Sequence, residues 1–462
     1  MKHITIITIV LLLMVGAAVQ AQATAPKITT QPLPAMVDAG QSATFTVVAT
    51  GTATLIYQWK YSTNGGVNWT AITGATSPSY VTAPTTISNS GTQYQCVVTN
   101  AAGGVSSTAV TLIVMPDPVC APMLTSSYYV NVKNAPFNAT GNGSTDDTAA
   151  IQAAVNNVLA HGSGTVYVPD GTYMINAVSR VLLGSNMTLY MSPGAILKVI
   201  PNNQDMYIVL NIGESLMSNV NVIGGTLLGD KYTHTGTTGE MGLGIALTGD
   251  TNNVVIEGVT SMEMWGDGFF MTTTSTDQTN SNITMCNDIA SDNRRQGMSI
   301  EQANGVKVMN STFTGTSGTA PQAGIDIEPD TGETVNNVQI TNSLFEYNNN
   351  SGIRMIQYTS GSTISNVLVN ANYFSGNVGG LTIYNPSNGK ITISNNTIED
   401  SNVFGVSFDW LSTGSQNIVT GNTFTYSGGA AYGIINSGNT GNIVTPNTCN
   451  GRACSCTNGI SC

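Results

Sequence analysis

The stretch Gly324-Ile325-Asp326-Ile327 is one copy of a short motif that recurs along the second half of the chain. In each copy a glycine precedes an apolar residue, a variable residue and, in most copies, a second apolar residue. The glycines lie 24 to 29 residues apart, and the copies begin at Gly244, Gly268, Gly297, Gly324, Gly352, Gly380, Gly405 and Gly433. A period of this length predicts a solenoid, in which each repeat buries its apolar residues against its neighbours.

A second strand-like segment recurs between these motifs and ends in an apolar residue. Its copies are Val308–Phe313, Ile340–Phe345, Val369–Phe374, Ile393–Ile398 and Val419–Phe424. Two or three short strands per repeat predict a parallel β-helix over residues 125–448. Small polar residues recur near the end of this segment, and we expect them to form an internal polar ladder of Ser311, Ser343, Asn372, Asn396 and Asn422.

Alternation along each strand predicts which side chains face outward. One outward column contains Ala246, Phe270, Ser299, Asp326, Arg354, Thr382 and Ser407, and a second contains Thr248, Thr272, Glu301, Glu328, Ile356, Tyr384 and Asp409. Neighbouring rungs lie about 4.8 Å apart. We therefore expect Glu301, Asp326, Glu328 and Arg354 to share one exposed patch. Arg294 and Arg295 should enter this patch from the preceding turn, and Asp267 should border it.

Crowded carboxylates suit acid–base catalysis, because each raises the pKa of the other and one stays protonated. Asp326 and Glu328, about 6.6 Å apart by backbone spacing, suit an inverting hydrolase that holds a water molecule between them. The repeat glycines are expected to face outward and leave room for a sugar chain. The alternative is a surface salt ladder, in which Asp326 pairs with Arg354 and Glu301 with Arg295.

The predicted catalytic residues are Asp326, Glu328, Asp267 and Glu301, although Asp267 between two glycines also suits a turn. The predicted substrate-binding residues are Arg294, Arg295, Arg354, Tyr384, His234 and Trp265. Residues 231–240 are expected to form a loop that walls the cleft and donates His234 or Glu240. A lone histidine in a polar loop is also typical of a solvated side chain, and the aromatic residues suit either packing or stacking on sugar rings.

Residues 25–115 have the features of a separate β-sandwich. Alternating strands at 43–47, 55–59 and 94–98 are separated by Gly, Asn and Ser clusters. Trp59 and the run Gly91–Cys96, with Tyr94 two residues before the cysteine, resemble an immunoglobulin-like domain. Val47 stands where that fold places the partner cysteine, so we expect no inter-sheet disulfide. The resemblance implies a spacer or binding module, and residues 116–124 are predicted to be a linker.

The chain has 462 residues, a formal charge of −12 and only 8% charged residues. So few bases argue against nucleic acid as a partner and against a polybasic membrane surface. Residues 1–23 have the charged start, apolar middle and small exit residues of a cleaved signal peptide. We therefore expect a secreted, extracellular or periplasmic protein without membrane insertion. Export favours disulfides, and two are expected in the tail 449–462, among Cys449, Cys454, Cys456 and Cys462, with the pairing open.

Residues ahead of the repeats carry a resemblance to a known superfamily. A short helix is expected over residues 146–154, followed by a strand and a turn over 164–173. The run Asp146-Asp147-Thr148-Ala149-Ala150-Ile151-Gln152 ahead of Val168-Pro169-Asp170-Gly171-Thr172-Tyr173 resembles the opening of the pectate-lyase-like superfamily. The resemblance covers residues 125–448. It implies an all-β, right-handed parallel β-helix (a solenoid) and a polysaccharide as the substrate.

That superfamily includes polygalacturonases, pectate and alginate lyases and mannuronan epimerases, and the residues leave the reaction open. The Gly-His-Gly and the paired aspartates of polygalacturonases are missing, and residues 326–329 lack the histidine of the epimerases. A hydrolase, which requires no cofactor and no metal site, is slightly favoured. A uronate lyase or C5-epimerase would neutralise the substrate carboxylate with Arg294, Arg295 or Arg354, or with a Ca2+ ion held by the acidic patch. A non-enzymatic glycan-binding adhesin is the third hypothesis, and a trimer is left open.

Overall fold

The computed structural model describes residues 23–32, 35–38, 40–89, 92–115, 128–213, 216–384, 389–399, 401, 403–409, 417–425, 432–436, 443–444 and 446–450. The chain divides into two compact units, residues 1–117 and 118–462. The expected signal peptide and linker lie outside the described residues, so these boundaries stay predictions. Within the described ranges, no helix is both long and apolar enough to cross a membrane.

The first unit is a β-sandwich. Its strands are β1 (Lys27–Thr30), β2 (Ala35–Asp38), β3 (Thr44–Thr46), β4 (Val48–Thr50), β5 (Ile56–Ser62), β6 (Thr70–Ala71), β7 (Ser79–Val81), β8 (Thr92–Asn100), β9 (Gly103–Ser106) and β10 (Val110–Met115), with a 3-10 helix at Ile87–Asn89. One sheet has the order β2-β10-β8-β5-β6, with β9 beside β8, while β1 pairs with β4 and β3 with β7. Trp59 is buried near Phe45, which stacks on Tyr94 at 4.6 Å between ring centroids. Cys96 is a buried free thiol, and the immunoglobulin-like assignment stays a prediction.

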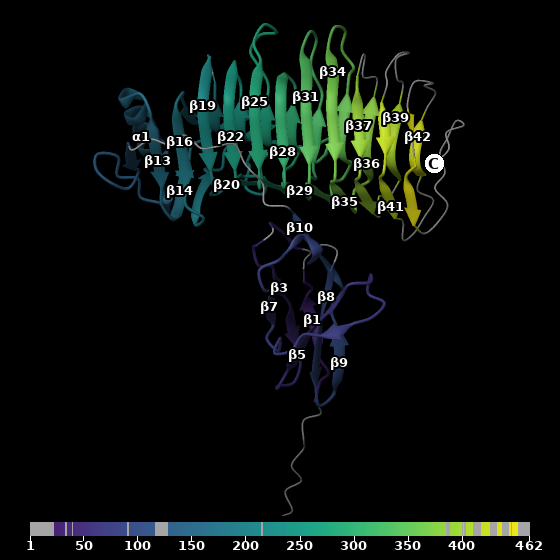
Figure 1. Cartoon of the computed structure of the whole chain (residues 1–462). Coiled ribbons are helices and arrows are strands. Elements are labelled where there is room, and N and C mark those ends of the chain that lie inside the picture. Colours follow the sequence, from purple (N-terminus) through teal and green to yellow (C-terminus); the bar gives the residue numbers. More distant parts are fainter. Residues whose placement is uncertain are drawn as a thin grey trace, which may run out of the picture. The chain divides into compact units, whose positions relative to one another are not determined.

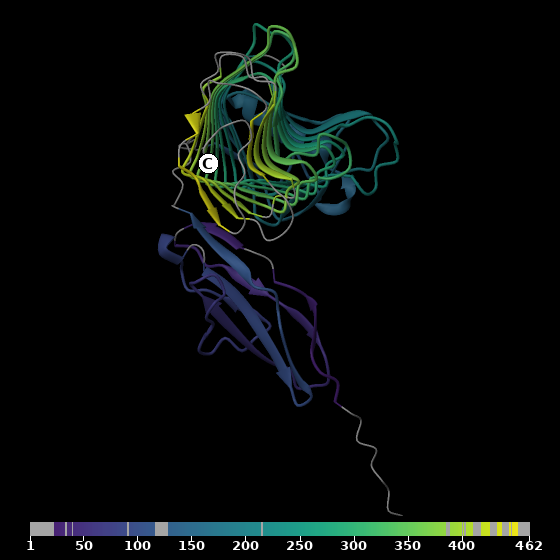
Figure 2. The ribbon, with the colours of Figure 1, turned by 90° about the vertical axis from the view of Figure 1, so that its right-hand side faces the viewer.

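The second unit is a parallel β-helix, which confirms the fold predicted from the repeats. Its turns stack into three long parallel sheets of 12, 12 and 10 strands (Figure 1), and successive turns superimpose when viewed along the axis of the unit (Figure 2). Sheet 1 contains β11 (Tyr129–Asn131), β13 (Gly164–Val168), β16 (Met187–Met191), β19 (Met217–Ile223), β22 (Thr251–Glu257), β25 (Asn280–Cys286), β28 (Ala303–Met309), β31 (Thr334–Thr341), β34 (Thr363–Asn370), β37 (Ile391–Ser394), β40 (Ile418–Thr420) and β43 (Ile443–Val444).

The other two sheets have the same stacking order. Sheet 2 contains β12 (Asn142–Asp146), β14 (Gly171–Ile175), β17 (Ala195–Val199), β20 (Thr226–Leu228), β23 (Thr260–Met262), β26 (Ile289–Ser291), β29 (Thr312–Thr314), β32 (Leu344–Glu346), β35 (Tyr373–Ser375), β38 (Thr397–Glu399), β41 (Thr423–Thr425) and β44 (Thr448–Asn450). Sheet 3 contains β15 (Val181–Leu183), β18 (Met206–Ile212), β21 (Met241–Leu247), β24 (Asp267–Met271), β27 (Gln296–Ile300), β30 (Ile325–Ile327), β33 (Ser351–Ile356), β36 (Gly379–Tyr384), β39 (Phe404–Asp409) and β42 (Tyr432–Asn436).

The helix α1 (Thr148–His161) lies at the N-terminal end of the β-helix (Figure 1). It begins later and runs longer than predicted, because Asp146 belongs to β12 and Asp147 is the N-cap. Ile151, Val155 and Val158 are fully buried against the first rungs. An end helix of this kind covers the exposed edge of a solenoid, which would otherwise pair with another chain.

The repeat glycines face the core, so the expectation that they face a sugar chain is wrong. A Cβ atom on Gly297 would lie 2.4 Å from the carbonyl oxygen of Gly324 and 2.9 Å from the Phe313 ring. A Cβ atom on Gly324 would meet the next rung and Phe345 in the same way. Phe313 and Phe345 belong to an inward aromatic stack with 5.2 Å between their centroids. Glycine therefore recurs because the stack and the adjacent rung approach too closely for any side chain.

The predicted polar ladder is confirmed inside the β-helix. Each ladder side chain accepts a hydrogen bond from the backbone N–H of the ladder residue one rung earlier, at 2.8 to 3.2 Å. The ladder extends beyond the prediction to Asp288 at one end and Asn447 at the other. Of the four tail cysteines only Cys449 is described; it is disulfide-bonded, and the pairing within the tail stays a prediction.

Replacing Asn372 with alanine is expected to lower the free energy of unfolding by about 2–4 kcal/mol. Its side chain accepts from the Ser343 N–H at 2.9 Å and donates to the Ile340 carbonyl at 2.8 Å, so alanine leaves buried polar groups without partners. Chemical denaturation would measure the loss. Asn349→Ala, which removes an exposed asparagine outside the ladder, should change stability by less than about 0.5 kcal/mol. Equal effects of the two substitutions would contradict a stabilising role for the ladder.

Candidate functional site

Sheet 3 carries the first predicted outward column in register. The residues paired across its strands are Ala246, Phe270, Ser299, Asp326, Arg354, Thr382 and Ser407. Ile300 pairs with Ile327 across β27 and β30. Glu301 directly follows Ile300 and Glu328 directly follows Ile327, so the two glutamates lie on adjacent rungs. Outward does not mean exposed, however, because Ser299 and Asp326 are buried. The predicted patch is therefore the floor of a recess and not an open surface.

Asp326 lies at the centre of this floor and is only 2% exposed. Its Oδ2 atom accepts from Gln296 Nε2 at 2.8 Å and from Arg354 Nη1 at 2.9 Å, while Oδ1 is buried without a hydrogen-bond partner. Burial raises the pKa of Asp326 to about 7, the Arg354 charge acts in the opposite direction, and Glu328 raises the pKa further. Near neutral pH this carboxyl group can therefore hold or release a proton.

Arg354 joins Asp326 to Glu328 through a single nitrogen. Its Nη1 atom lies 2.9 Å from Asp326 Oδ2 and 2.7 Å from Glu328 Oε2. The two carboxylates therefore converge on one guanidinium group, and no water molecule can occupy that position while Arg354 is there. The predicted arrangement, with water held between Asp326 and Glu328 at backbone spacing, is corrected accordingly. The predicted pairing of Asp326 with Arg354 is present, in a largely buried setting.

Asp267 is fully buried on β24 and anchors Arg295. Its Oδ2 atom accepts from Arg295 Nη1 at 2.9 Å and from Ser299 Oγ at 2.7 Å. Burial raises the pKa of Asp267 to about 6 against the opposing charge of Arg295. The salt-ladder alternative predicted that Arg295 pairs with Glu301. Arg295 pairs with Asp267 instead. Full burial and these contacts suit a residue that positions Arg295, and a catalytic role for Asp267 stays a prediction.

A pocket of about 240 Å³ opens over this floor, and its lining residues are Arg295, Ser299, Glu301, Asp326, Glu328 and Asp330. Burial raises the pKa of Glu301 to about 8, a hydrogen bond with Thr272 lowers it, and Glu333 and Asp330 raise it further. Glu301 is less buried than Asp326. The pocket therefore combines an acid that stays protonated at neutral pH with carboxylates held by arginine.

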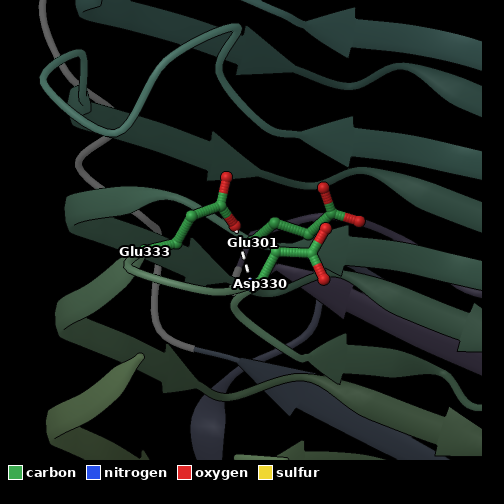
Figure 3. Close-up of side chains that lie close together, drawn as sticks. All are labelled: Glu301, Asp330 and Glu333. Carbon is green, nitrogen blue, oxygen red and sulfur yellow. Dashed lines mark hydrogen bonds between the residues drawn. The ribbon is translucent and has the colours of Figure 1, made fainter. Parts of the chain in front are cut away.

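Glu301, Asp330 and Glu333 form the one group of three potential metal ligands within the described ranges (Figure 3). One carboxylate oxygen from each lies within 4.8 Å of the others, and Glu333 accepts from the Asp330 N–H at 2.8 Å. Three carboxylates suit a hard cation such as Ca2+, which prefers oxygen ligands. Burial also raises the pKa of Glu333, so a cation would compete with protons at this cluster.

The loop over residues 229–240 buries the side chain of His234, whereas Tyr232 and Glu240 of the same loop are exposed. His234 Nδ1 lies 2.9 Å from Asp230 Oδ2, and both side chains are fully buried. The His234 ring stacks on Trp265 at 4.0 Å, and the Arg294 guanidinium lies 3.8 Å from the Trp265 centroid. The predicted substrate contact of His234 is therefore corrected to packing, while those of Trp265 and Arg294, which are both partly exposed, stay predictions. The expected alternative of a solvated histidine is also wrong.

Tyr384 lies on the rung beyond Arg354, as the second column predicted. It pairs with Ile356 across β33 and β36. Its ring centroid is 4.8 Å from that of Tyr358, which is 59% exposed. Neither tyrosine lines the pocket described above. They form an aromatic pair on the same face of the β-helix, so a role in sugar binding stays a prediction.

The sequence reasoning missed Gln296, Asp330 and Glu333. Gln296 directly precedes a repeat glycine and donates to Asp326. Asp330 and Glu333 lie in the connection between β30 and β31, just after Glu328 and Pro329. The run of four acidic residues between 326 and 333 was the available signal. Repeat alignment could not place Asp330 and Glu333, because they lie outside the repeating strands.

Three family models match the chain. One described as rhamnogalacturonase A/epimerase, pectate lyase-like matches residues 129–373. One for a right-handed β-helix region matches residues 320–449, and a domain of unknown function, DUF8696, matches residues 28–116. Together with the three parallel sheets, the first two matches show a right-handed parallel β-helix.

Individual similar proteins cover only parts of the chain. An uncharacterized protein of Bacillus subtilis (strain 168), YclG, is 30% identical over 220 residues, which are 42% of this chain and 37% of that protein. Mannuronan C5-epimerase AlgE3 of Azotobacter vinelandii is 54% identical over 46 residues, 10% of this chain and 2% of that protein. The chain thus spans less than two thirds of either relative. The N-terminal fragment of bacteriophage Phi29 gene product 12 has a TM-score of 0.54 at 17% identity, covers 69% of this chain and 62% of its own, and shows the fold alone.

Proposed function

Because this chain belongs to the rhamnogalacturonase A/epimerase, pectate lyase-like family, we propose that it hydrolyses a polysaccharide in the pocket on sheet 3. The observation that carries the proposal is the lining of that pocket, where Glu301, Asp326, Glu328 and Asp330 converge with Arg295. The raised pKa values of Asp326, about 7, and Glu301, about 8, keep protonated and charged carboxyl groups side by side. Carboxyl groups held in different protonation states are what acid–base cleavage of a glycosidic bond requires.

Glu301 is the general acid in this proposal. Its pKa of about 8 leaves it protonated at neutral pH, and it borders the pocket without being enclosed as Asp326 is. Glu301 donates its proton to the glycosidic oxygen as the bond from that oxygen to the anomeric carbon breaks. Assistance by a positioned acid accelerates such a step by about 10²–10⁴-fold.

Glu328 is the base, one rung away from Glu301. Arg354 fixes its Oε2 atom at 2.7 Å and also holds Asp326 at 2.9 Å. Glu328 takes a proton from a water molecule whose oxygen bonds to the anomeric carbon, so the products are a new reducing end and a free hydroxyl. Asp326, Gln296 and Arg354 are positioning residues that hold this carboxylate. No cofactor enters these steps.

Substrate binding beyond the pocket falls to Arg295 and to the aromatic pair. Arg295 lines the pocket, and its N–H groups suit the hydroxyls of a sugar ring. Tyr384 and Tyr358 offer rings on the same face for stacking on a neighbouring sugar. A polysaccharide substrate agrees with the expected export of the chain, which rests on residues 1–23.

A uronate lyase or C5-epimerase is the second candidate. It is favoured by the 46-residue similarity to a mannuronan C5-epimerase and by the cluster of Glu301, Asp330 and Glu333, which suits Ca2+. Such an enzyme neutralises the substrate carboxylate and then abstracts the adjacent proton. A lyase forms an unsaturated uronate that absorbs ultraviolet light, whereas hydrolysis does not.

Pectic, alginate and neutral polysaccharides assayed together distinguish the candidates. We expect reducing ends without ultraviolet absorbance, and a loss of at least about 10²-fold in Asp326→Asn and Glu328→Gln with the fold retained. Reducing ends with absorbance would show a lyase. Binding with neither signal would fit a C5-epimerase or a glycan-binding adhesin, and the NMR spectrum of the recovered polymer separates the two, because only an epimerase changes its uronate composition. Cleavage by both variants at the wild-type rate would show that the chemistry lies elsewhere.

A further inference from the structure

Arg295 and Arg354, the arginines at the floor of the pocket, are already paired with protein carboxylates, and Arg294 is not among the residues that line the pocket. Arg354 Nη1 holds Asp326 and Glu328 at 2.9 and 2.7 Å. Arg295 Nη1 holds Asp267 at 2.9 Å, and its Nε lies 4.0 Å from Glu240. Arg294 lies over Trp265 and donates to the Gly239 carbonyl at 3.0 Å. Recognition of a sugar carboxylate relies on an arginine or lysine whose charge is not yet neutralised.

The balance of charge in the pocket is negative. Its described lining has four acids and one base, and the buried partners Asp267 and Arg354 add one of each. With Glu301 and Asp326 both protonated, Asp267, Glu328 and Asp330 still outnumber Arg295 and Arg354. A substrate carboxylate would therefore enter a recess of like charge, where a partly buried setting strengthens the repulsion.

The described lining offers Arg295 as the one candidate, among the expected Arg, Tyr or His, for abstracting a proton next to a carboxylate, and Arg295 is held in an ion pair with Asp267. The lining contains no lysine, histidine or tyrosine. His234, the histidine of the adjacent loop, has a fully buried side chain paired with Asp230. Ser299 and the remaining N–H groups of Arg295 suit neutral hydroxyls instead.

From these contacts we infer that the pocket accepts an uncharged sugar residue at the cleavage position and rejects a uronate. This inference rests on the proposed function, because it assigns the substrate class of the same pocket. It departs from the anionic polymer named by a similar protein, mannuronan. The reason is that Asp267, Asp326 and Glu328 already occupy the charges of Arg295 and Arg354. Hydrolysis does not require a carboxylate on the sugar, so a pocket that rejects uronates is compatible with the proposed reaction.

Matched polymers test the inference directly. Polygalacturonate, mannuronan and glucuronan are each compared with their carboxyl-reduced forms, which differ only in a CH2OH group in place of the carboxylate. Binding to the Asp326→Asn variant, which keeps Glu301, Asp330 and Glu333, is measured by calorimetry in EDTA and, separately, in about 2 mM CaCl2. We expect at least one reduced polymer to bind at least about tenfold more tightly than its parent. This ratio of affinities should fall as NaCl is raised from about 20 to 500 mM, because salt screens the repulsion.

A graded pair of variants assigns the cause to charge. Asp330 is exposed at the rim, and Asp330→Asn followed by Asp330→Lys should raise the affinity for each uronate polymer stepwise relative to that for its reduced form. Equal or tighter binding of a uronate, in EDTA or only with Ca2+, would overturn the inference, as would failure of every reduced polymer to bind.

The two proposals fail in different ways. If reduced polymers bind but the wild-type chain does not cleave them, the proposed hydrolysis is wrong and the inferred substrate class stands. If the wild-type chain hydrolyses a uronate polymer without ultraviolet absorbance, hydrolysis stands and the inferred substrate class is wrong.

Discussion

Glu301→Gln is expected to lower the turnover of a polysaccharide by about 10²–10⁴-fold, because glutamine cannot donate the proton that the leaving oxygen needs. In the wild-type chain, activity should decline as the pH rises through about 8, where Glu301 loses that proton. The residual activity of the variant should lack this decline. A glycoside with an aryl leaving group, built on the sugar that the polymer assay identifies, should recover much of the lost rate because it departs without protonation.

The same substitution should make the fold more stable. The pKa of Glu301 rises from 4.5 to about 8 on folding, so between these values the native state binds more protons than the unfolded state and stability falls as the pH rises. Glutamine does not titrate. The stability gained by the variant should therefore grow from about pH 5 to pH 8 and reach about 1 kcal/mol or more.

Glu346→Gln is the matched control. Burial raises the pKa of Glu346 to about 7, but this residue ends β32 on sheet 2, away from the pocket lining. The control should gain stability with pH in a similar way and leave turnover unchanged. Denaturation at several pH values, together with the reducing-end assay, measures both effects. Full activity of Glu301→Gln, or an equal loss in Glu346→Gln, would contradict the assignment of the general acid.

Arg354→Met is expected to abolish detectable turnover and to lower the free energy of unfolding by about 3–5 kcal/mol, as breaking a buried ion pair does. Its Nη1 atom is the shared partner of Asp326 and Glu328. Burial raises the pKa of Asp326 and the Arg354 charge opposes that rise, so its removal raises the pKa further. The loss of stability should therefore be larger at pH 9 than at pH 6, where Asp326 takes up a proton.

The double variant Arg354→Met with Asp326→Asn tests this cause. Asparagine removes the buried charge that Arg354 no longer compensates. The losses of stability in the two single variants should therefore add up to more than the loss in the double variant. Turnover should stay lost, because Glu328 no longer has its anchor. Lys307→Met, which removes an exposed lysine on β28, should change stability by less than about 0.5 kcal/mol. Additive losses in the double variant would show that Asp326 and Arg354 act independently.

The register of the site was accessible from the sequence because a solenoid repeats at short range. Each rung pairs with the next, so aligning Gly297, Gly324 and Gly352 was enough to bring Ser299, Asp326 and Arg354 into one column. The ladder from Ser311 to Asn422 followed for the same reason. Side-chain alternation is a property of the strand itself and needs no knowledge of the loops.

The loops escaped that reasoning, because they do not repeat and their contacts span long stretches of chain. Asp330 and Glu333 reach Glu301 from the connection after β30. Loop 229–240 buries His234 against Trp265, which lies on the next rung. No periodicity predicts which loop folds over which strand, so the exposure of a side chain on an outward column could not be derived.

The sequence by itself determined the β-helix, the order of its rungs and the gathering of Glu301, Asp326, Glu328 and Arg354 on one face of it. Tertiary structure alone decided how those charges are used. The tertiary structure pairs Asp267 with Arg295 and places one nitrogen of Arg354 between Asp326 and Glu328. It also buries Glu301, which raises the pKa of that residue. The physical reason is that pairing between rungs follows from local strand pattern, whereas desolvation and ion pairing depend on every side chain and loop that excludes water from the same few ångströms.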